Sequence, residues 1–259
     1  EIFQGTGRAK LEDTLPRYLQ QRRWFGGKAR HIKSIDVLDA VPLPTNGGAS
    51  TLGGEGSSVH LVLLRVGYTE GDPETYALPL GFAHGSKARA IEQRAPQAAV
   101  ALLRSHERDG SREGIVYDAV WDQRFADLLL DAIGRRRRFR GTVGEIVASA
   151  TSAFRHLRGS PEEELAASVA PWEQSNTSIV YGNRLILKLF RRVDEGVNPD
   201  LELGRFLTER TAFAHVPQVA GALEYRPARG EPMTLAILQG YVPNEGDAWR
   251  YTLDALGNY

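Results

Sequence analysis

Two apolar runs on either side of a glycine–asparagine pair constrain the fold more than any other feature of this chain. The runs are Ser178–Tyr181 and Leu185–Phe190, and Gly182-Asn183 lies between them. Runs of this kind around such a pair predict a β-hairpin with a two-residue turn. The second run contains Lys188. Because a buried ammonium group is costly unless it is paired, Lys188 must either point to solvent at a sheet edge or meet a negative partner.

Further elements before and after the hairpin predict an antiparallel sheet with one helix. Asn198 can cap a helix that has Pro199 in its first turn. Gly230 lies at a turn between the last two apolar runs. The expected elements are a strand at 168–173, the hairpin, a helix at 199–211, and strands at 219–226 and 233–242.

The N-terminal part predicts a separate small domain with one helix and a few antiparallel strands. The expected elements are a helix at 11–25 and strands at 32–41, 59–67 and 75–82. The stretch at 44–58 is rich in glycine and serine, which predicts a loop. This domain is expected to end near residue 95, and the fold class of the whole chain is therefore α+β.

After residue 95 the pattern favours a mostly helical segment. Apolar residues at helical spacing predict a helix from about Trp121 to Gly134. Thr142 and Glu145 form a capping box, which predicts a second helix. That helix would carry the apolar residues Ile146, Val147, Ala150 and Phe154.

Composition excludes several kinds of site. Lys plus Arg and Asp plus Glu each number 32, so the formal net charge is zero and nothing favours nucleic acid. The basic run RRRRFR at 135–140 is accordingly interpreted as a solvated surface between helices. The chain has no cysteine, which fits a reducing, cytoplasmic compartment. No metal site and no membrane contact are expected, because the six histidines lack ligand spacing and no apolar run is long enough to cross a bilayer.

A lysine on the third strand and an acidic residue on the following helix predict a nucleotide site. In kinase-like small lobes such a lysine holds nucleotide phosphates, and a glutamate on the helix holds the lysine. Lys188 and Glu202 stand at these positions. Lys188 would supply a point charge for α- and β-phosphate oxygens, and Glu202 would fix it in place. The alternative is an exposed lysine on an edge strand.

The other nucleotide contacts are expected at a turn and at the end of a strand. A kinase has a glycine-rich loop between its first two strands, whereas this chain has QSNTS at 174–178. Small hydroxyl and amide side chains can also donate hydrogen bonds to phosphate, although an ordinary polar loop is the alternative. The predicted phosphate contacts there are Ser175, Asn176 and Thr177. The predicted adenine-binding hinge is Gln239, Gly240, Tyr241 and Val242.

Four ordered motifs together are more specific than any one of them. The motifs are RRWFGGKAR, EQSNTSIVYGNRLILKLFRR, GVNPDLELGRFLTE and ALEYR…TLAILQGYVPNEGDAWRYTLDAL. They resemble bacterial maltokinases, and most closely those fused to trehalose synthase. The resemblance covers nearly the whole chain from about Leu15. It implies an enzyme that uses ATP and Mg²⁺ to convert maltose into maltose 1-phosphate, which feeds glycogen and other α-glucan synthesis. It also implies a fold similar to aminoglycoside phosphotransferases and protein kinases.

The same resemblance implies how the chain is divided. Residues 1–95 would be an N-terminal cap subdomain, 96–242 an intermediate subdomain with a kinase-like N-lobe, and 243–259 the start of a linker. A further lobe would hold the catalytic aspartate, the Mg²⁺ ligands and the maltose pocket. The chain has no H-G-D motif, and Asp247 in EGDAW has no histidine before it. We therefore expect no catalytic residue here and an inactive N-terminal fragment that binds ATP weakly at most.

Two other functions stay open at this point. One is a kinase for another sugar or an aminosugar, because the resemblance puts the sugar pocket outside this chain. Alternatively, it is a non-catalytic binding or assembly module on a kinase-like scaffold. In that case the basic run at 135–140 and the glycine-rich stretch at 46–57 would suit a partner surface, such as a fused or separate trehalose synthase.

Overall fold

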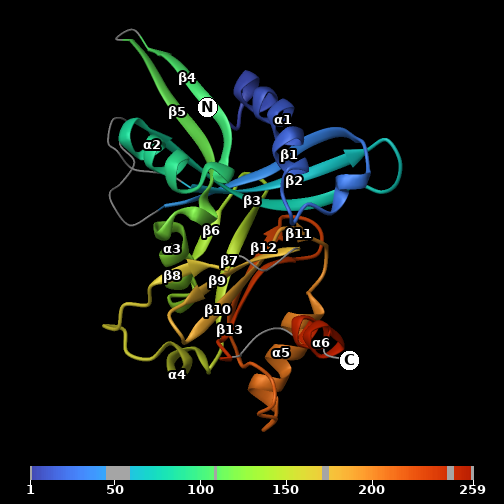
Figure 1. Ribbon diagram of the computed structural model, residues 1–259, viewed down its shortest axis with the longest axis vertical. Coiled ribbons are helices and arrows are strands. Elements are labelled where there is room, and N and C mark those ends of the chain that lie inside the picture. The colour runs from blue at the N-terminus through green and yellow to red at the C-terminus, as the bar shows by residue number, and fades with distance from the viewer. Residues whose placement is uncertain (1, 45–58, 108–109, 171–174, 244–247, 258–259) are drawn as a thin grey trace.

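Two antiparallel β-sheets and the helices packed against them make up the protein (Figure 1). The computed structural model describes residues 2–44, 59–107, 110–170, 175–243 and 248–257. The predicted α+β class is confirmed. The predicted glycine-rich loop, apart from Pro44, lies outside the described residues, as do Gln174 and Asp247.

The first sheet has the strand order β1-β2-β3-β5-β4, and the short β11 also pairs with β3. Helix α1 covers one face of this sheet, with its buried residues in the same cluster as alternate residues of the strands. The bounds are α1 (Gly5–Gln20), β1 (Ile32–Leu43), β2 (Val59–Tyr68), β3 (Glu74–His84), β4 (Ala99–Glu107), β5 (Gly110–Asp118) and β11 (Arg192–Val193). The short helices beside it are η1 (Gly26–Ala29), α2 (Gly85–Arg94) and η2 (Pro96–Ala98).

The second sheet has the strand order β6-β7-β12-β13-β10-β9-β8. Its strands are β6 (Arg138–Arg140), β7 (Gly144–Ala150), β8 (Ala167–Val169), β9 (Asn176–Tyr181), β10 (Leu185–Phe190), β12 (Val219–Pro227) and β13 (Met233–Gly240). The helices around it are η3 (Ala119–Trp121), α3 (Gln123–Gly134), α4 (Phe154–Arg158), α5 (Pro199–Arg210) and α6 (Ala248–Gly257). No helix in the described part of the chain has the length and apolarity that a bilayer crossing requires.

Strand β2 explains why the first sheet is buried on both faces. It is apolar at most positions, and successive residues of a strand point to opposite sides. Leu64 belongs to the apolar cluster that contains the buried residues of α1. Its neighbour Leu63 belongs to a larger cluster, which also contains buried residues of α3 and of the second sheet. The two sheets therefore share one continuous core.

A β-bulge turns the side chains of β1 from one face of the first sheet to the other. Val37 belongs to the cluster around α1, whereas Val41 belongs to the cluster shared with the second sheet. Consecutive residues of β2 pair with Val37 and Asp39, so Leu38 is the extra residue. Because one extra residue reverses the alternation, the bulge aims Asp39 at the second sheet.

Asp39 joins the two sheets through a set of hydrogen bonds. Its side chain is buried, and its carboxylate accepts bonds from the backbone N–H groups of Thr142, Val143 and Gly144 at 2.9, 3.1 and 3.0 Å. It also accepts from its neighbour's N–H group at 2.9 Å and from the Tyr225 hydroxyl at 2.9 Å. The turn between β6 and β7 is thereby fixed to β1 of the first sheet.

The segment after residue 95 contains strands that the sequence analysis missed. β4 and β5 pair as a hairpin and extend the first sheet past the predicted domain boundary. The helix predicted near Trp121–Gly134 is confirmed as α3. Its last turn leads into β6, where Phe139 of the basic run is buried. The run therefore does not lie between two helices: it begins at the C-cap of α3 and its last three residues form β6. Its arginines at 135, 137 and 138 pair with nearby acidic side chains.

The helix predicted from the capping box at Thr142 and Glu145 is wrong, because 144–150 forms strand β7. β7 pairs with β6 and β12, and Ile146 and Ala148 are buried at the two-residue spacing of a strand. A short apolar segment fits both periods, so pairing with a neighbouring strand decides the outcome.

The elements predicted around Lys188 occur in the predicted order, with the short β11 as an additional strand between β10 and α5, and their sheet has seven strands instead of the five expected. The Asn198 side chain caps α5 by accepting a bond from the N–H group of Asp200 at 2.9 Å. The turn between β9 and β10 differs in length from the prediction. Tyr181 pairs with Leu185, so three residues form this turn instead of two.

Candidate functional site

Lys188 lies on an interior strand of the second sheet. β10 is flanked by β9 and β13, and Lys188 pairs with Ser178 on one side and Ile237 on the other. Its neighbours Leu187 and Leu189 are buried in the shared core. The lysine side chain points to the opposite face, where it is 32% exposed. The lysine is therefore not on a sheet edge, and its position leaves the ammonium group accessible.

The acidic partner of Lys188 is Asp200, in the first turn of α5. The Lys188 Nζ and Asp200 Oδ2 atoms lie 3.1 Å apart. The predicted partner Glu202 is in the same turn but exposed, and no ion pair joins it to Lys188 among the described residues. Asp200 is 60% exposed, and ion pairs of this kind contribute only about 0–1 kcal/mol. An anion such as a phosphate can therefore displace Asp200 at little cost.

Of the predicted hinge residues, Gln239 shares a face with Lys188. Gln239 pairs with Ile186, and directly paired residues of antiparallel strands point the same way. Gln239 thus lies on the half-open face. Ile237, which pairs with Lys188, is two residues away along β13, a distance of about 7 Å. The N–H groups of Gly240 and Tyr241 already donate to backbone carbonyls at 2.9 and 2.8 Å. Adenine contact through these two groups would require that backbone to rearrange, and Val242 follows as an exposed residue.

Of the predicted phosphate turn, Asn176 and Thr177 belong to strand β9 instead, and two of its three predicted side chains are accessible while one is buried. Ser175 is exposed and Asn176 is half-buried, with the Asn176 amide 3.3 Å from the Ser175 hydroxyl. Thr177 is buried, and its hydroxyl oxygen accepts a hydrogen bond from Arg191 Nε at 2.8 Å. The Thr177 side chain therefore faces the interior of the protein.

Arg191 is the residue near this site that the sequence analysis missed. It is 1% exposed and forms an ion pair of 2.9 Å with Asp118, which is equally buried. A signal was present in the sequence. Continuing the alternation of Leu187 and Leu189 puts residue 191 on the buried side, where a charged residue must have a partner.

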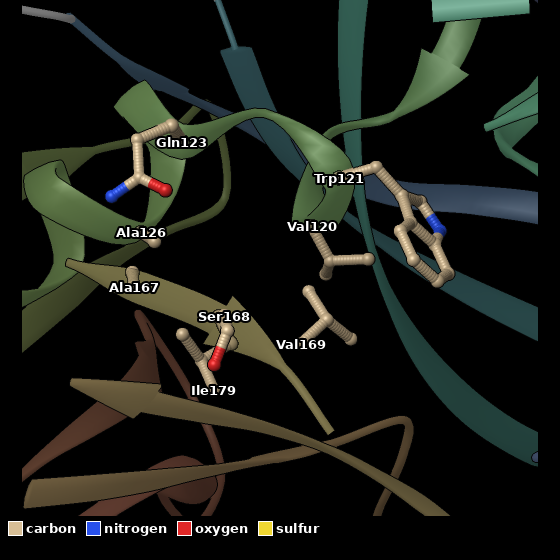
Figure 2. Close-up of a pocket in the computed structure, with 8 residues that line it drawn as sticks. All are labelled: Val120, Trp121, Gln123, Ala126, Ala167, Ser168, Val169 and Ile179. Carbon is tan, nitrogen blue, oxygen red and sulfur yellow. The ribbon is translucent and has the colours of Figure 1, made fainter. Parts of the chain in front are cut away.

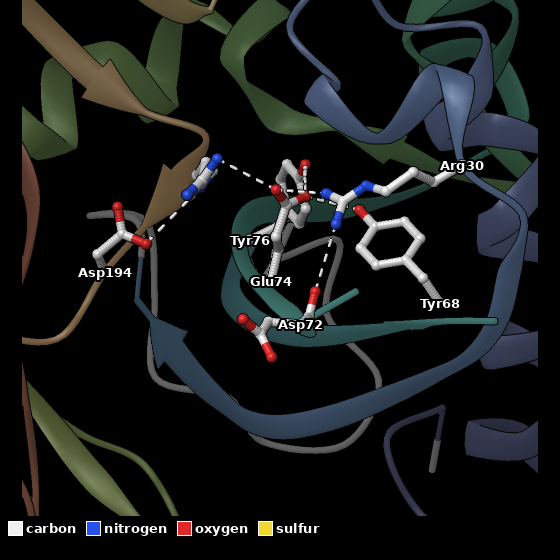
Figure 3. A network of polar contacts seen from close by, with 7 residues as sticks. Arg30, Tyr68, Asp72, Glu74, Tyr76 and Asp194 are labelled. Atoms are coloured by element: carbon white, nitrogen blue, oxygen red, sulfur yellow. Dashed lines mark hydrogen bonds and ion pairs between the residues drawn. The ribbon is translucent and has the colours of Figure 1, made fainter. Parts of the chain in front are cut away.

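A second polar network gathers around Glu74 of the first sheet (Figure 3). Glu74 accepts hydrogen bonds from the Tyr68 and Tyr76 hydroxyls at 2.6 and 2.7 Å. It also pairs with Arg30 at 2.5 Å and with Arg192 at 3.1 Å. One carboxylate thus gathers groups from β2, β3, β11 and the RRWFGGKAR motif.

These contacts set the pKa of Glu74. Burial alone would raise the pKa of its carboxyl, but the hydrogen bonds from Tyr68, Tyr76 and Arg30 and the charge of Arg192 lower it below the ordinary value. In turn, burial and the bond to Glu74 raise the pKa of Tyr68 to about 12. The network is therefore built around an ionised Glu74.

Replacing Glu74 by glutamine is expected to lower the free energy of unfolding by about 1 to 2 kcal/mol at neutral pH. Because the folded pKa is depressed, this stabilisation is present above the unfolded pKa of about 4.3 and is lost as the pH falls through the folded value. Urea unfolding at a series of pH values should show the two proteins converging below that pH. The exposed Glu70→Gln in the turn after β2 is the control, and an equal loss there would contradict the account.

A small cavity lies between η3, α3 and the edge of the second sheet (Figure 2). Its volume is about 180 Å³, below the range of about 300–1,000 Å³ that is usual for ligand pockets. None of the predicted nucleotide contacts lines it. The lining residues are Val120, Trp121, Gln123, Ala126, Ala167, Ser168, Val169 and Ile179. No group of three or more His, Asp or Glu side chains is arranged for a metal ion within the described residues.

Residues 18–122 match the family model of the maltokinase N-terminal cap domain. The match begins within α1 and ends just after η3, so it takes in every strand of the first sheet except β11. It supports the resemblance of the N-terminal part to maltokinases. It also supports a maltokinase-related role and a parent enzyme of the kinase type.

Proposed function

We propose that this chain is the nucleotide-facing part of an ATP-dependent maltokinase. Its reaction would transfer the γ-phosphoryl group of ATP to maltose, giving maltose 1-phosphate and ADP on a route from trehalose to glycogen. The observation that carries the proposal is Lys188. It lies on an interior strand with its ammonium group on a half-open face and a weakly held Asp200 beside it. The match of the N-terminal part to a maltokinase cap supports maltose as the substrate of this kinase.

In this proposal Lys188 releases Asp200 and binds the α- and β-phosphate oxygens of ATP. The carboxylate stays in the first turn of α5, where the helix dipole favours a negative charge. Asp200 thus holds the lysine until nucleotide arrives, and Glu202 in the same turn is the second candidate for this role. Ser175 and Asn176, at the start of β9, would contact the phosphates as well. The segment from Gln239 to Val242 would lie against adenine.

The described residues do not fit a resident Mg²⁺ site, so no step is assigned to that ion within this chain. Its ligands, the catalytic aspartate and the maltose pocket belong in the proposal to a second lobe. A contact surface for that lobe is available on α5 and α6, where large apolar side chains are exposed. They are Leu203, Phe206, Trp249, Leu253 and Leu256.

We also propose a division into a cap and an N-lobe, with the boundary moved from residue 95 to about 122. The hairpin β4–β5 belongs to the first sheet, and the family match ends at the same point. A cytoplasmic location and a trehalose synthase partner, fused or separate, complete the proposal. A different sugar acceptor remains the alternative within the same reaction class.

Binding of ATP tests the part of the function that this chain would carry. Loss of one charge-assisted hydrogen bond weakens binding by about 1.5 to 3 kcal/mol. Lys188→Met is therefore expected to raise the Kd for ATP by about 10- to 100-fold. Titration calorimetry with the 259-residue chain measures this. Lys33→Met, at an exposed position on β1, is the matched control and should bind as the unmodified chain does. Equal binding by both variants would refute the assignment of Lys188 and favour the binding-module function.

A further inference from the structure

Arg191 is the largest fully buried side chain of the protein among the described residues, and it directly follows the strand of Lys188. Its surroundings come from both sheets. A buried guanidinium group is costly unless its geometry with a partner is good. Its position therefore calls for an explanation beyond simple packing.

On one side Arg191 is held by the first sheet and α1. Its Nη2 atom lies 2.9 Å from Asp118 Oδ2, and Asp118 also accepts a hydrogen bond from the Tyr18 hydroxyl at 3.1 Å. The guanidinium carbon lies 4.8 Å from the ring centre of Trp24 in the RRWFGGKAR motif. The backbone carbonyl of Arg191 accepts a hydrogen bond from the N–H group of Ala77 on β3 at 2.7 Å.

On the other side Arg191 holds β9. Its Nε atom donates to the Thr177 hydroxyl at 2.8 Å. A guanidinium group is planar and rigid. Because Arg191 bonds to both Asp118 and Thr177, it fixes the position of Thr177 relative to Asp118. The Nη1 atom is buried and has no hydrogen-bond partner within the described residues. Nearly all buried donors in proteins have a hydrogen-bond partner, so a side chain that served stability alone would be expected to satisfy Nη1 as well.

We propose that Arg191 is a positioning residue through which the N-terminal sheet sets the nucleotide affinity of the second sheet. By fixing Thr177 it holds the start of β9, with Ser175 and Asn176, beside β10, the strand of Lys188. The inference rests on the proposed nucleotide site and adds a role for the N-terminal part, which is to keep Ser175 and Asn176 at the start of β9 in position. Arg191 itself touches no phosphate.

The adjacent Arg192 provides a matched comparison. It also joins the segment after β10 to the first sheet, through Glu74 at 3.1 Å, but none of its contacts reaches Thr177. Arg192→Met therefore weakens the junction between the sheets without releasing the turn. Arg191→Lys keeps the positive charge beside Asp118 but loses the fork that also reaches Thr177. The double variant Arg191→Met with Asp118→Asn removes the buried pair without leaving an unpaired charge, which protects folding.

Two measurements on the 259-residue chain separate positioning from stability. Hydrogen exchange of the backbone amides at 176–178, without nucleotide, should become about tenfold faster in Arg191→Lys and in the double variant. The Kd for ATP should rise by about five- to 20-fold in both, a range typical of coupling between sites. Arg192→Met should leave both quantities within about twofold. Circular dichroism and urea unfolding confirm that each variant is folded.

The outcomes separate this inference from the proposed function. If exchange at 176–178 and the Kd for ATP change no more in the Arg191 variants than in Arg192→Met, the positioning role is overturned and Arg191 is only structural. If exchange accelerates as expected while Lys188→Met leaves the Kd for ATP unchanged, the link between the sheets stands. The proposed nucleotide site is then refuted, and the effect on affinity is refuted with it.

Discussion

Replacement of Asp39 by alanine is expected to lower the free energy of unfolding by about 3 to 5 kcal/mol. The carboxylate is 3% exposed and accepts bonds from a run of backbone N–H groups in the β6–β7 turn and from the Tyr225 hydroxyl. Alanine would leave these donors buried without an acceptor, and each one costs about 1 to 3 kcal/mol unless water reaches it. Urea unfolding measures the loss directly.

The effect should be confined to this carboxylate. Asp36 lies three residues earlier on β1 and is exposed, so Asp36→Ala is expected to change stability by no more than about 0.5 kcal/mol. Asp39→Asn keeps one acceptor oxygen and should cost less than alanine does. Similar losses for Asp36→Ala and Asp39→Ala would show that the β6–β7 turn does not depend on this carboxylate.

The second large effect concerns catalysis in the gene product that contains this sequence. Lys188→Met is expected to lower kcat by about 10²- to 10³-fold, because a cation that neutralises phosphate charge in the transition state contributes about as much as an oxyanion-hole donor. Arg30→Met is a control within the chain. Arg30 belongs to the Glu74 network in the first sheet and, within the described part of the chain, contacts none of Ser175, Asn176 and Lys188, so its variant should affect stability more than kcat.

Short-range sequence patterns were sufficient to predict strands and helices that are marked by their own turn, capping or apolar residues. The β9–β10 hairpin, the cap at Asn198 and the face of α3 all followed from turn residues, capping chemistry or apolar spacing. The segment 144–150 could not be assigned in this way, because its apolar residues fit two periods and its strand partner β12 lies more than 70 residues later in the sequence.

The links between the sheets were harder to predict because they depend on long-range geometry. Asp39 faces the second sheet only because Leu38 forms a bulge, and nothing in the residues themselves marks that position. The pairing of Lys188 with Asp200 in place of Glu202 depends on where α5 begins relative to β10. Arg191 was more accessible to prediction, since a charge at a buried position of a strand requires a partner.

The most direct test of the central claim is formation of maltose 1-phosphate by the gene product. Phosphorus NMR would follow the products from maltose, ATP and Mg²⁺, with Lys188→Met and the 259-residue chain assayed beside it. The account predicts maltose 1-phosphate from the gene product, about 10²- to 10³-fold slower formation with Lys188→Met, and none from the 259-residue chain alone. Absence of product from maltose, or a rate that Lys188→Met leaves unchanged, would contradict it.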